Sequence, residues 1–164
     1  MTLLMRPHEA LEQLHALRSR TGEMDTIGLS DDVIVRFCEH DDHLSRAISE
    51  ATVRFEEIVE EFGIDTLQHK EVDLIKLLQQ DYVNFYNPAT VNPYIALSGR
   101  GPWIVTAYGA VLHDNGGYGM LGAGHGPGAV IEAMSGNWVM ANVMTASFSQ
   151  KRLAERLVKG LGHT

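Results

Sequence analysis

The sequence predicts an α+β fold that is predominantly helical. Apolar residues recur at helical spacing through the first half of the chain, and a short β-hairpin with glycine-rich sequence follows in the second half. Residues 1–87 carry 18 acidic and 8 basic side chains with three glycines, whereas residues 88–164 carry 3 acidic and 5 basic side chains with thirteen glycines. We therefore expect two regions, an acidic helical extension over 1–87 and a differently built segment over 88–164.

The acidic region predicts three amphipathic helices joined by short connections. In each of them apolar side chains recur every three or four positions, and glycines or turn sequences separate them. The helices are expected over residues 7–20, 31–62 and 65–85. The second has a heptad-like seam from Phe37 to Phe62 whose one polar interruption is Asp41. Such a seam packs against neighbouring helices or against a partner.

The second region predicts a β-hairpin, a glycine-rich loop and two helices. Because an isolated hairpin is only marginally stable, we expect it to pair with strands that this chain does not supply. The expected elements are strands over 103–108 and 110–113 around Gly109, a glycine-rich stretch over 116–128, and helices over 127–136 and 149–160.

The composition excludes several classes of function. The chain has 164 residues, 45% of them hydrophobic and 21% charged, with a net charge of -8. Nucleic acids and anionic membranes bind basic surfaces, and no apolar run is long enough to cross a bilayer, so neither is an expected partner. The single cysteine, Cys38, can form no internal disulfide. We expect it to be a small buried hydrophobic residue in a cytoplasmic protein.

Two short patterns are typical of chemistry but have simpler interpretations. Residues 117–122 match the dinucleotide-binding fingerprint, yet the expected helix begins only after Pro127, so a glycine-rich turn is favoured. Residues 39–43 contain two histidines among acidic residues and could ligate a metal, but a solvated helix face is favoured and no metal is predicted. The remaining histidines have no serine, cysteine or histidine partner at a diagnostic spacing, and no catalytic residue is assigned.

From Gly101 to Leu157 the chain resembles the N-terminal segment of class III aminotransferases, which are pyridoxal-phosphate enzymes of fold type I. The resemblance covers about a third of the chain. It is carried, in order, by Gly101-Pro102-Trp103, the turn at Gly109, Gly116-Gly117-Tyr118, Leu121, Gly124-His125, Val130-Ile131-Glu132-Ala133, Thr145-Ala146-Ser147-Phe148 and Leu153-Ala154-Glu155-Arg156-Leu157. It implies that this region is the N-terminal part of the small domain of such an enzyme.

The resemblance also implies which residues meet the substrate. Tyr118 falls where some family members place an aromatic that lines the substrate pocket, and Gly117 and Gly119 would let the backbone approach the ligand. Phe148 and Ser149 fall where a second loop approaches that pocket, often from the partner subunit of a homodimer. Gly124-His125 is expected to form a structural turn.

The resemblance also implies a cofactor, pyridoxal 5'-phosphate, whose binding residues we do not expect in this chain. In the family, the Schiff-base lysine and the groups that hold pyridoxal 5'-phosphate lie downstream, in a large α/β domain, and no lysine here has that context. We therefore expect the cofactor to bind only in a full-length enzyme, with this chain acting in a homodimer or with the missing domain. The expected reaction moves an amino group from a small amino donor to a keto or aldehyde acceptor. The alternatives are a non-catalytic helical interaction module that uses the Phe37–Phe62 seam and, less favoured, a small-ligand enzyme that uses the glycine loop.

Overall fold

The computed structural model describes residues 6–80, 93–115, 122–137 and 146–162. The chain divides into two compact units, Met1–Ile131 and Glu132–Thr164, which are considered separately.

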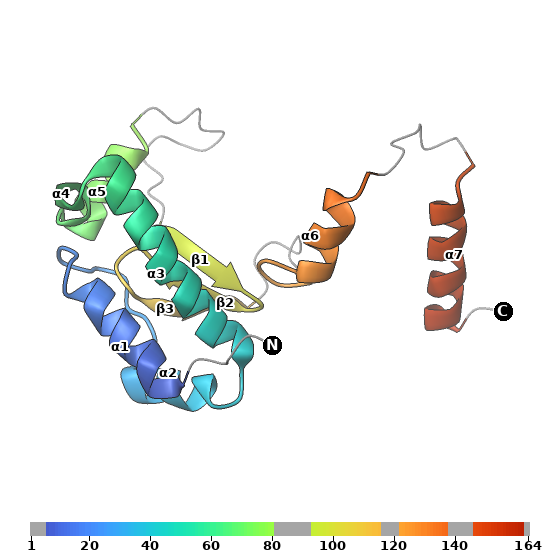
Figure 1. The fold of residues 1–164 in the computed structure, drawn as a ribbon, viewed down its shortest axis with the longest axis horizontal. Coiled ribbons are helices and arrows are strands. Elements are labelled where there is room, and N and C mark those ends of the chain that lie inside the picture. The colour runs from blue at the N-terminus through green and yellow to red at the C-terminus, as the bar shows by residue number, and fades with distance from the viewer. Residues whose placement is uncertain (1–5, 81–92, 116–121, 138–145, 163–164) are drawn as a thin grey trace. The chain divides into compact units, whose positions relative to one another are not determined.

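The first unit combines helices with a small antiparallel sheet (Figure 1). Its elements are α1 (Pro7–Arg18), α2 (Asp31–Cys38), α3 (Asp42–Phe62), α4 (Ile64–Leu67), α5 (Glu71–Leu78), β1 (Ala96–Arg100), β2 (Trp103–Thr106) and β3 (Val111–His113), with α6 (Gly128–Ser135) reaching across the division. The sheet has the order β1-β2-β3. The expected fold class, α+β and mostly helical, is confirmed.

The prediction of a single helix over residues 31–62 is wrong. The chain forms α2 and α3 instead, and Asp41 is the N-cap of α3, with its side chain accepting a hydrogen bond from the His43 backbone N–H at 2.8 Å. A carboxylate that accepts a hydrogen bond from a free backbone N–H group favours the start of a helix over its interior. The polar interruption in the seam therefore marks the boundary between α2 and α3.

The helix expected over residues 65–85 is also divided. Its first turn is α4, and a second helix, α5, begins after Lys70 and ends at Leu78. Residues 81–85 of the expected helix lie outside the described residues.

The hairpin of β2 and β3 is confirmed, but the prediction that it pairs with strands from outside this chain is wrong. Strand β1, from this chain, pairs antiparallel with β2, and Arg100 lies opposite Trp103. The turn between β2 and β3 contains Gly109 at φ +78°, a conformation that glycine adopts without strain. Strand β1 contains a glycine and polar residues and is poor in β-branched side chains, so its local sequence gave little indication of a strand.

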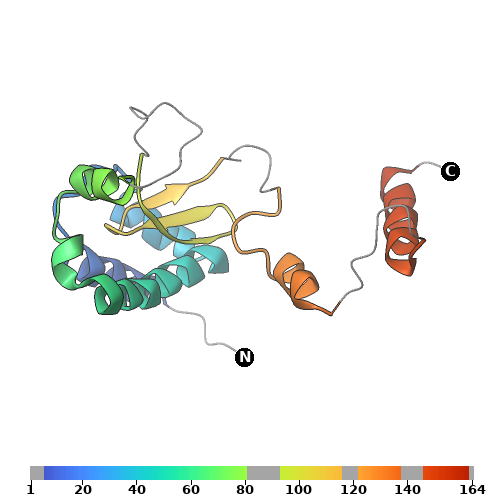
Figure 2. The ribbon, with the colours of Figure 1, turned by 90° about the horizontal axis from the view of Figure 1, so that it is seen from above.

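The helices of the acidic region and the strands share their hydrophobic cores. Figure 2 shows the strands lying over the layer formed by α1 and α3. One core cluster joins α1, α2 and α3 to β2 and β3 through Ala10, Leu14, Ile34, Cys38, Leu44, Ala47, Ile48, Ala51, Trp103, Val105 and Val111. A second contains Leu17, Phe55, Leu67, Leu74, Ala107 and Tyr108. The change of composition near residue 87 therefore does not coincide with the division between the compact units; that residues 1–87 are an extension remains a prediction.

The second unit contains the end of α6 and the whole of α7 (Phe148–Leu161). Ser147 caps α7 by accepting a hydrogen bond from the Gln150 backbone N–H, and Gly162 ends it at φ +68°. Both helices lie within two residues of their expected bounds. Among the described helices, none combines the length and the apolar character needed to cross a membrane.

Candidate functional site

The glycine-rich stretch leaves the sheet at Asp114 and returns to it at His125. The Asp114 backbone N–H donates to the Pro102 carbonyl at 2.7 Å. His125 and Gly101 exchange two backbone hydrogen bonds, of 2.7 and 2.9 Å, and so form an isolated β-bridge. Both ends of the stretch are therefore fixed at the turn between β1 and β2.

The side chains of Asp114 and His125 also meet. His125 Nε2 lies 3.0 Å from Asp114 Oδ2, and the two side chains are 23% and 22% exposed. A carboxylate can only accept, so a neutral His125 donates from Nε2 and keeps Nδ1 as an acceptor. The pair is an orienting contact of the kind that fixes an imidazole tautomer.

Glycines allow the close approach at this turn. A Cβ on Gly124, which has φ +74°, would lie 2.7–2.8 Å from the backbone of Gly101, and a Cβ on Gly99 would lie 2.9 Å from the Cβ of His125. These separations are shorter than ordinary contacts, so both positions require glycine. Where Gly124-His125 was expected to form a structural turn, His125 pairs with Gly101 in a β-bridge and Gly124 has a positive φ beside it.

Arg100 ties the same turn to α3. Its guanidinium hydrogen-bonds to both carboxylate oxygens of Glu50 at 2.6–2.9 Å, and Nη1 donates to the Gly126 carbonyl at 2.8 Å. The bond to Glu50 raises the pKa of Arg100 above its ordinary value. The turn that precedes α6 is thus held by the strand, by its own bridge and by a helix.

A cavity of about 280 Å³ opens beside the pair. It is lined by Gly101, Pro102, Asp114, Gly122, Ala123, Gly124 and His125. Five of these residues are glycine, alanine or proline, so their walls are backbone and small apolar groups. Among these lining residues, the side chains that carry functional groups are those of Asp114 and His125.

The predicted substrate-binding residues are not gathered at this cavity by the described structure. Gly117, Tyr118 and Gly119 lie outside the described residues. Phe148 and Ser149 are the first two residues of α7, in the other compact unit, and Phe148 is 83% exposed. Their contact with a substrate remains a prediction.

In the segment 39–43, expected to be a solvated helix face, every residue but Asp41 is exposed, but the segment spans the break between α2 and α3 and Asp41 is partly buried. Asp41 Oδ2 accepts a hydrogen bond from the indole Nε1 of Trp103 at 2.6 Å while the same side chain caps α3. Cys38 is buried, as expected, and burial raises the pKa of its thiol. Within the described ranges no three histidine, cysteine, aspartate or glutamate side chains lie close enough together to hold a metal ion.

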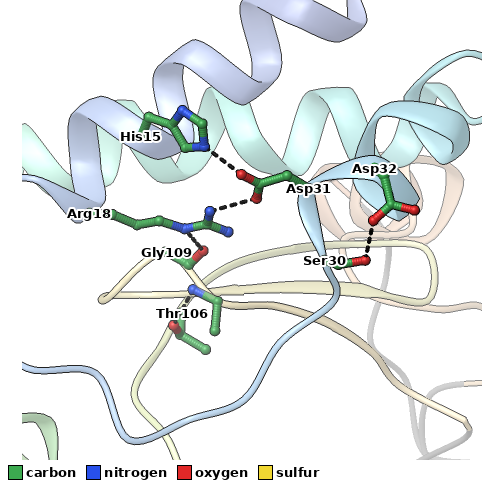
Figure 3. A network of polar contacts seen from close by, with 8 residues as sticks. His15, Arg18, Ser30, Asp31, Asp32, Thr106 and Gly109 are labelled. Carbon is green, nitrogen blue, oxygen red and sulfur yellow. Dashed lines mark hydrogen bonds and ion pairs between the residues drawn. The ribbon is translucent and has the colours of Figure 1, made fainter.

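A second aspartate–histidine contact has a structural role (Figure 3). Asp31 accepts from Arg18 Nη1 at 2.7 Å and lies 2.6 Å from His15 Nε2, while Arg18 Nε donates to the Gly109 carbonyl at 3.0 Å. These contacts join α1 to the start of α2 and to the β2–β3 turn. Hydrogen bonds from Arg18 and then His15 lower the pKa of Asp31.

The lysines do not fit the cofactor that the resemblance implies. Lys70, Lys76 and Lys151 form ion pairs with Glu23, Asp73 and Glu155, and each of the three lysine side chains is at least 60% exposed. Lys159, in the last turn of α7, is also exposed. A Schiff-base lysine needs a desolvated amine, and these exposed lysines do not meet that requirement.

The Asp114–His125 pair was missed in the sequence because its members lie eleven positions apart, with several glycines between them. The available signal was the aspartate directly after a predicted strand and the histidine in a predicted glycine turn. Comparisons of the chain with protein-family models, curated proteins and solved structures give no match.

Proposed function

We propose that this chain is the N-terminal portion of a pyridoxal-phosphate-dependent aminotransferase and that it contributes part of the substrate pocket and the contacts of a homodimer. The observation that supports this proposal is the turn at Gly101-Pro102, where the hairpin, the glycine-rich stretch and the Gly124-His125 turn meet. That order of elements is the one implied by the resemblance to class III aminotransferases.

In this proposal the chain's own residues position and enclose the substrate. The Gly101–His125 bridge and the Arg100–Gly126 bond fix the two sides of the turn that leads into α6. Tyr118, which lies outside the described residues, would line the substrate pocket, as the resemblance implies. The groups that bind the cofactor are supplied by the large domain, in a longer chain or in a partner.

One observation weighs against the alternative of a helical interaction module. The central seam residues Leu44, Ile48 and Phe55 are buried inside this chain's own cores. A seam already packed against α1 and the sheet offers few of its apolar groups to a partner helix.

The test begins with the coding sequence after Thr164. The complete product of that reading frame, purified from its natural source with any associated chains, should retain pyridoxal phosphate and show its near-visible absorption. Amino donors should change that absorption, and a keto acid should restore it. A product that takes up no cofactor and transfers no amino group would overturn the proposal.

A variant of Tyr118 tests whether this chain contributes to the substrate pocket. We expect Tyr118→Ala to lower kcat/KM by roughly tenfold or more through lost substrate contacts, while cofactor content is unchanged. Ile27→Ala, which alters an exposed side chain between α1 and α2, is the matched control and should retain full activity. Equal activity of Tyr118→Ala and wild type would argue against the assigned role of Tyr118.

A further inference from the structure

Helix α7 has well-defined ends but no buried residue. Ser147 caps its first turn, and Gly162 ends it in a left-handed conformation. The large apolar side chains of its last nine positions are 51–71% exposed, and they are Leu153, Leu157, Val158 and Leu161. A helix of 14 residues is only marginally stable by itself in water, so α7 gains stability from a surface that covers these side chains.

The side chains of α7 divide into an apolar face and a charged face. Successive residues of an α-helix are rotated by about 100°, so residues three and four positions apart lie on the same side. The apolar face consists of Leu153, Ala154, Leu157, Val158 and Leu161. The opposite side carries every charged residue of the helix, together with Phe148 in the first turn: Lys151, Arg152, Glu155, Arg156 and Lys159. Such a division is typical of a helix at a boundary between apolar and aqueous surroundings.

The charge of α7 indicates what kind of surface covers the apolar face. The helix carries four basic side chains and one acidic side chain, a net charge of +3, in a chain whose net charge is -8. A second α7 would bring an equal positive charge, which disfavours pairing between two copies of this helix. At a salt concentration of about 0.15 M, charges more than about 8 Å apart are largely screened. The local charge of α7 therefore favours contact with a negatively charged surface.

We propose that α7 binds the surface of an anionic phospholipid bilayer and lies parallel to it. The apolar face enters the boundary between headgroups and acyl chains, and the basic side chains pair with the lipid phosphates. The long apolar stems of lysine and arginine let their charges reach the headgroups while the backbone lies deeper. The expectation that no membrane is a partner rested on the charge of the whole chain, whereas α7 alone is positive. This binding is independent of the proposed aminotransferase function.

The test is flotation of the whole 164-residue chain with lipid vesicles on a density gradient. Vesicles of phosphatidylcholine alone are compared with vesicles of equal parts phosphatidylcholine and phosphatidylglycerol. We expect the chain to float with the anionic vesicles and to stay at the bottom with the neutral ones. Salt at about 1 M, where the screening length is about 3 Å, should weaken the binding severalfold. Equal flotation with both kinds of vesicle, or with neither, would overturn the proposal.

Removal of two positive charges tests the charged face. Arg156→Gln combined with Lys159→Gln should weaken binding to the anionic vesicles by roughly tenfold or more, because each basic side chain near such a surface contributes roughly fivefold. The matched control combines Arg36→Gln with Arg54→Gln, at exposed positions of α2 and α3, and should bind as the wild type does. Equal weakening in the two double variants would refute the assignment to α7.

An acidic substitution tests the apolar face. Leu157→Asp places a carboxylate in the layer that the apolar face enters and should abolish flotation, whereas Val53→Asp, at an exposed position of α3, should retain it. If Leu157→Asp lowers the helix content seen by circular dichroism, hydrogen exchange of the wild-type chain decides the question. Anionic vesicles should then slow exchange at the α7 amides and leave the α2 amides unchanged, and unchanged exchange at α7 would overturn the proposal.

A protein that covers the apolar face would give a different result. If a second copy of the chain covers it, the wild type sediments as a dimer, Leu157→Asp sediments as a monomer, and neither floats with vesicles. That outcome would overturn membrane binding and leave the proposed function untouched. Flotation of a chain whose longer product transfers no amino group would remove the proposed function alone.

Discussion

Trp103 donates its indole N–H to Asp41 Oδ2 at 2.6 Å, and the other oxygen of the same carboxylate accepts the backbone N–H of His43 at 2.8 Å. One side chain thereby caps the start of α3 and anchors the buried indole at the start of β2. Trp103 is 1% exposed, and its ring meets those of Phe37 and His113 edge-on, at centroid distances of 4.9 and 4.8 Å.

Removal of the Asp41 carboxylate should therefore destabilise the fold through two effects. Asp41→Ala loses a helix cap, about 1 kcal/mol, and leaves a buried indole N–H without its acceptor, about 1–3 kcal/mol. We expect the free energy of unfolding to fall by about 2–4 kcal/mol in urea titrations followed by circular dichroism. Asp42→Ala, at the exposed next position, should cost less than about 1 kcal/mol. Equal losses in the two variants would contradict the dual role of Asp41.

Glu71 supports a different segment, the connection between α1 and α2. It is fully buried, and Oε2 accepts the backbone N–H groups of Asp25 and Thr26 at 2.9 and 2.8 Å, while Oε1 accepts the Thr26 hydroxyl at 2.9 Å. Glu71→Ala leaves these donors unsatisfied and should lower the free energy of unfolding by about 3 kcal/mol or more. Glu61→Ala, an exposed carboxylate on α3, should change it by less than about 0.5 kcal/mol. A loss as small for Glu71 as for Glu61 would show that the connection does not depend on this carboxylate.

Local patterns were sufficient for the elements whose burial repeats along the chain. Leu14 and Leu17 marked the buried face of α1, and Ile48, Ala51 and Phe55 marked that of α3. Each of these side chains lies three or four positions from the next, so helical periodicity identifies it without knowledge of its partner.

Long-range contacts decided the features that the sequence did not reveal. Asp41 reads as an interruption of a seam, and only its contact with Trp103, 62 positions away, explains its place in the core. Glu71 reads as an exposed helix residue, and its buried state depends on a loop 45 positions away. The turn at His125 was predictable from its glycines, but its contacts with Asp114 and Gly101 have no local periodicity.

Asp31 should make stability depend on pH. Hydrogen bonds from Arg18 and His15 lower its pKa in the folded protein below the ordinary value of 3.8. The folded state therefore binds fewer protons than the unfolded state in the acid range, so this stabilisation is present above the unfolded pKa and is lost as the pH falls through the folded pKa. We expect the difference in unfolding free energy between wild type and Asp31→Asn to be largest near neutral pH and to shrink below about pH 4.

A double-mutant cycle assigns this effect to its cause. In an Arg18→Gln background, Asp31→Asn should change stability less than it does in wild type, because the main partner of the carboxylate has been removed. A pH-independent difference between wild type and Asp31→Asn, or full additivity with Arg18→Gln, would contradict the ion pair as the source.

Tyr108 should make the stability of the fold depend on pH in the alkaline range. Its hydroxyl donates to the His69 carbonyl at 2.8 Å, and burial raises the pKa of Tyr108 to about 12. The folded state retains this proton after an unfolded tyrosine, with a pKa of about 10, has lost it. Stability from Tyr108 is therefore complete below the unfolded pKa and is lost as the pH rises through the folded one. Tyr108→Phe should be less stable at neutral pH but lose less stability between about pH 10 and 12, measured by urea unfolding. Parallel curves for the two proteins would contradict this role.

Gly124 and Gly122 provide a matched test of the turn that carries His125. An added methyl at Gly124 meets the Gly101 backbone at 2.7–2.8 Å in a left-handed conformation of φ +74°, whereas nothing lies within 4 Å of the same group at Gly122. Gly124→Ala should therefore open the Gly101–His125 bridge and raise hydrogen exchange at those two amides by roughly tenfold or more. Gly122→Ala should leave their exchange unchanged, and the Val105 amide in β2 should stay protected in both variants. Equal exchange at Gly101 and His125 in the two variants would show that the close approach of Gly124 does not hold the turn.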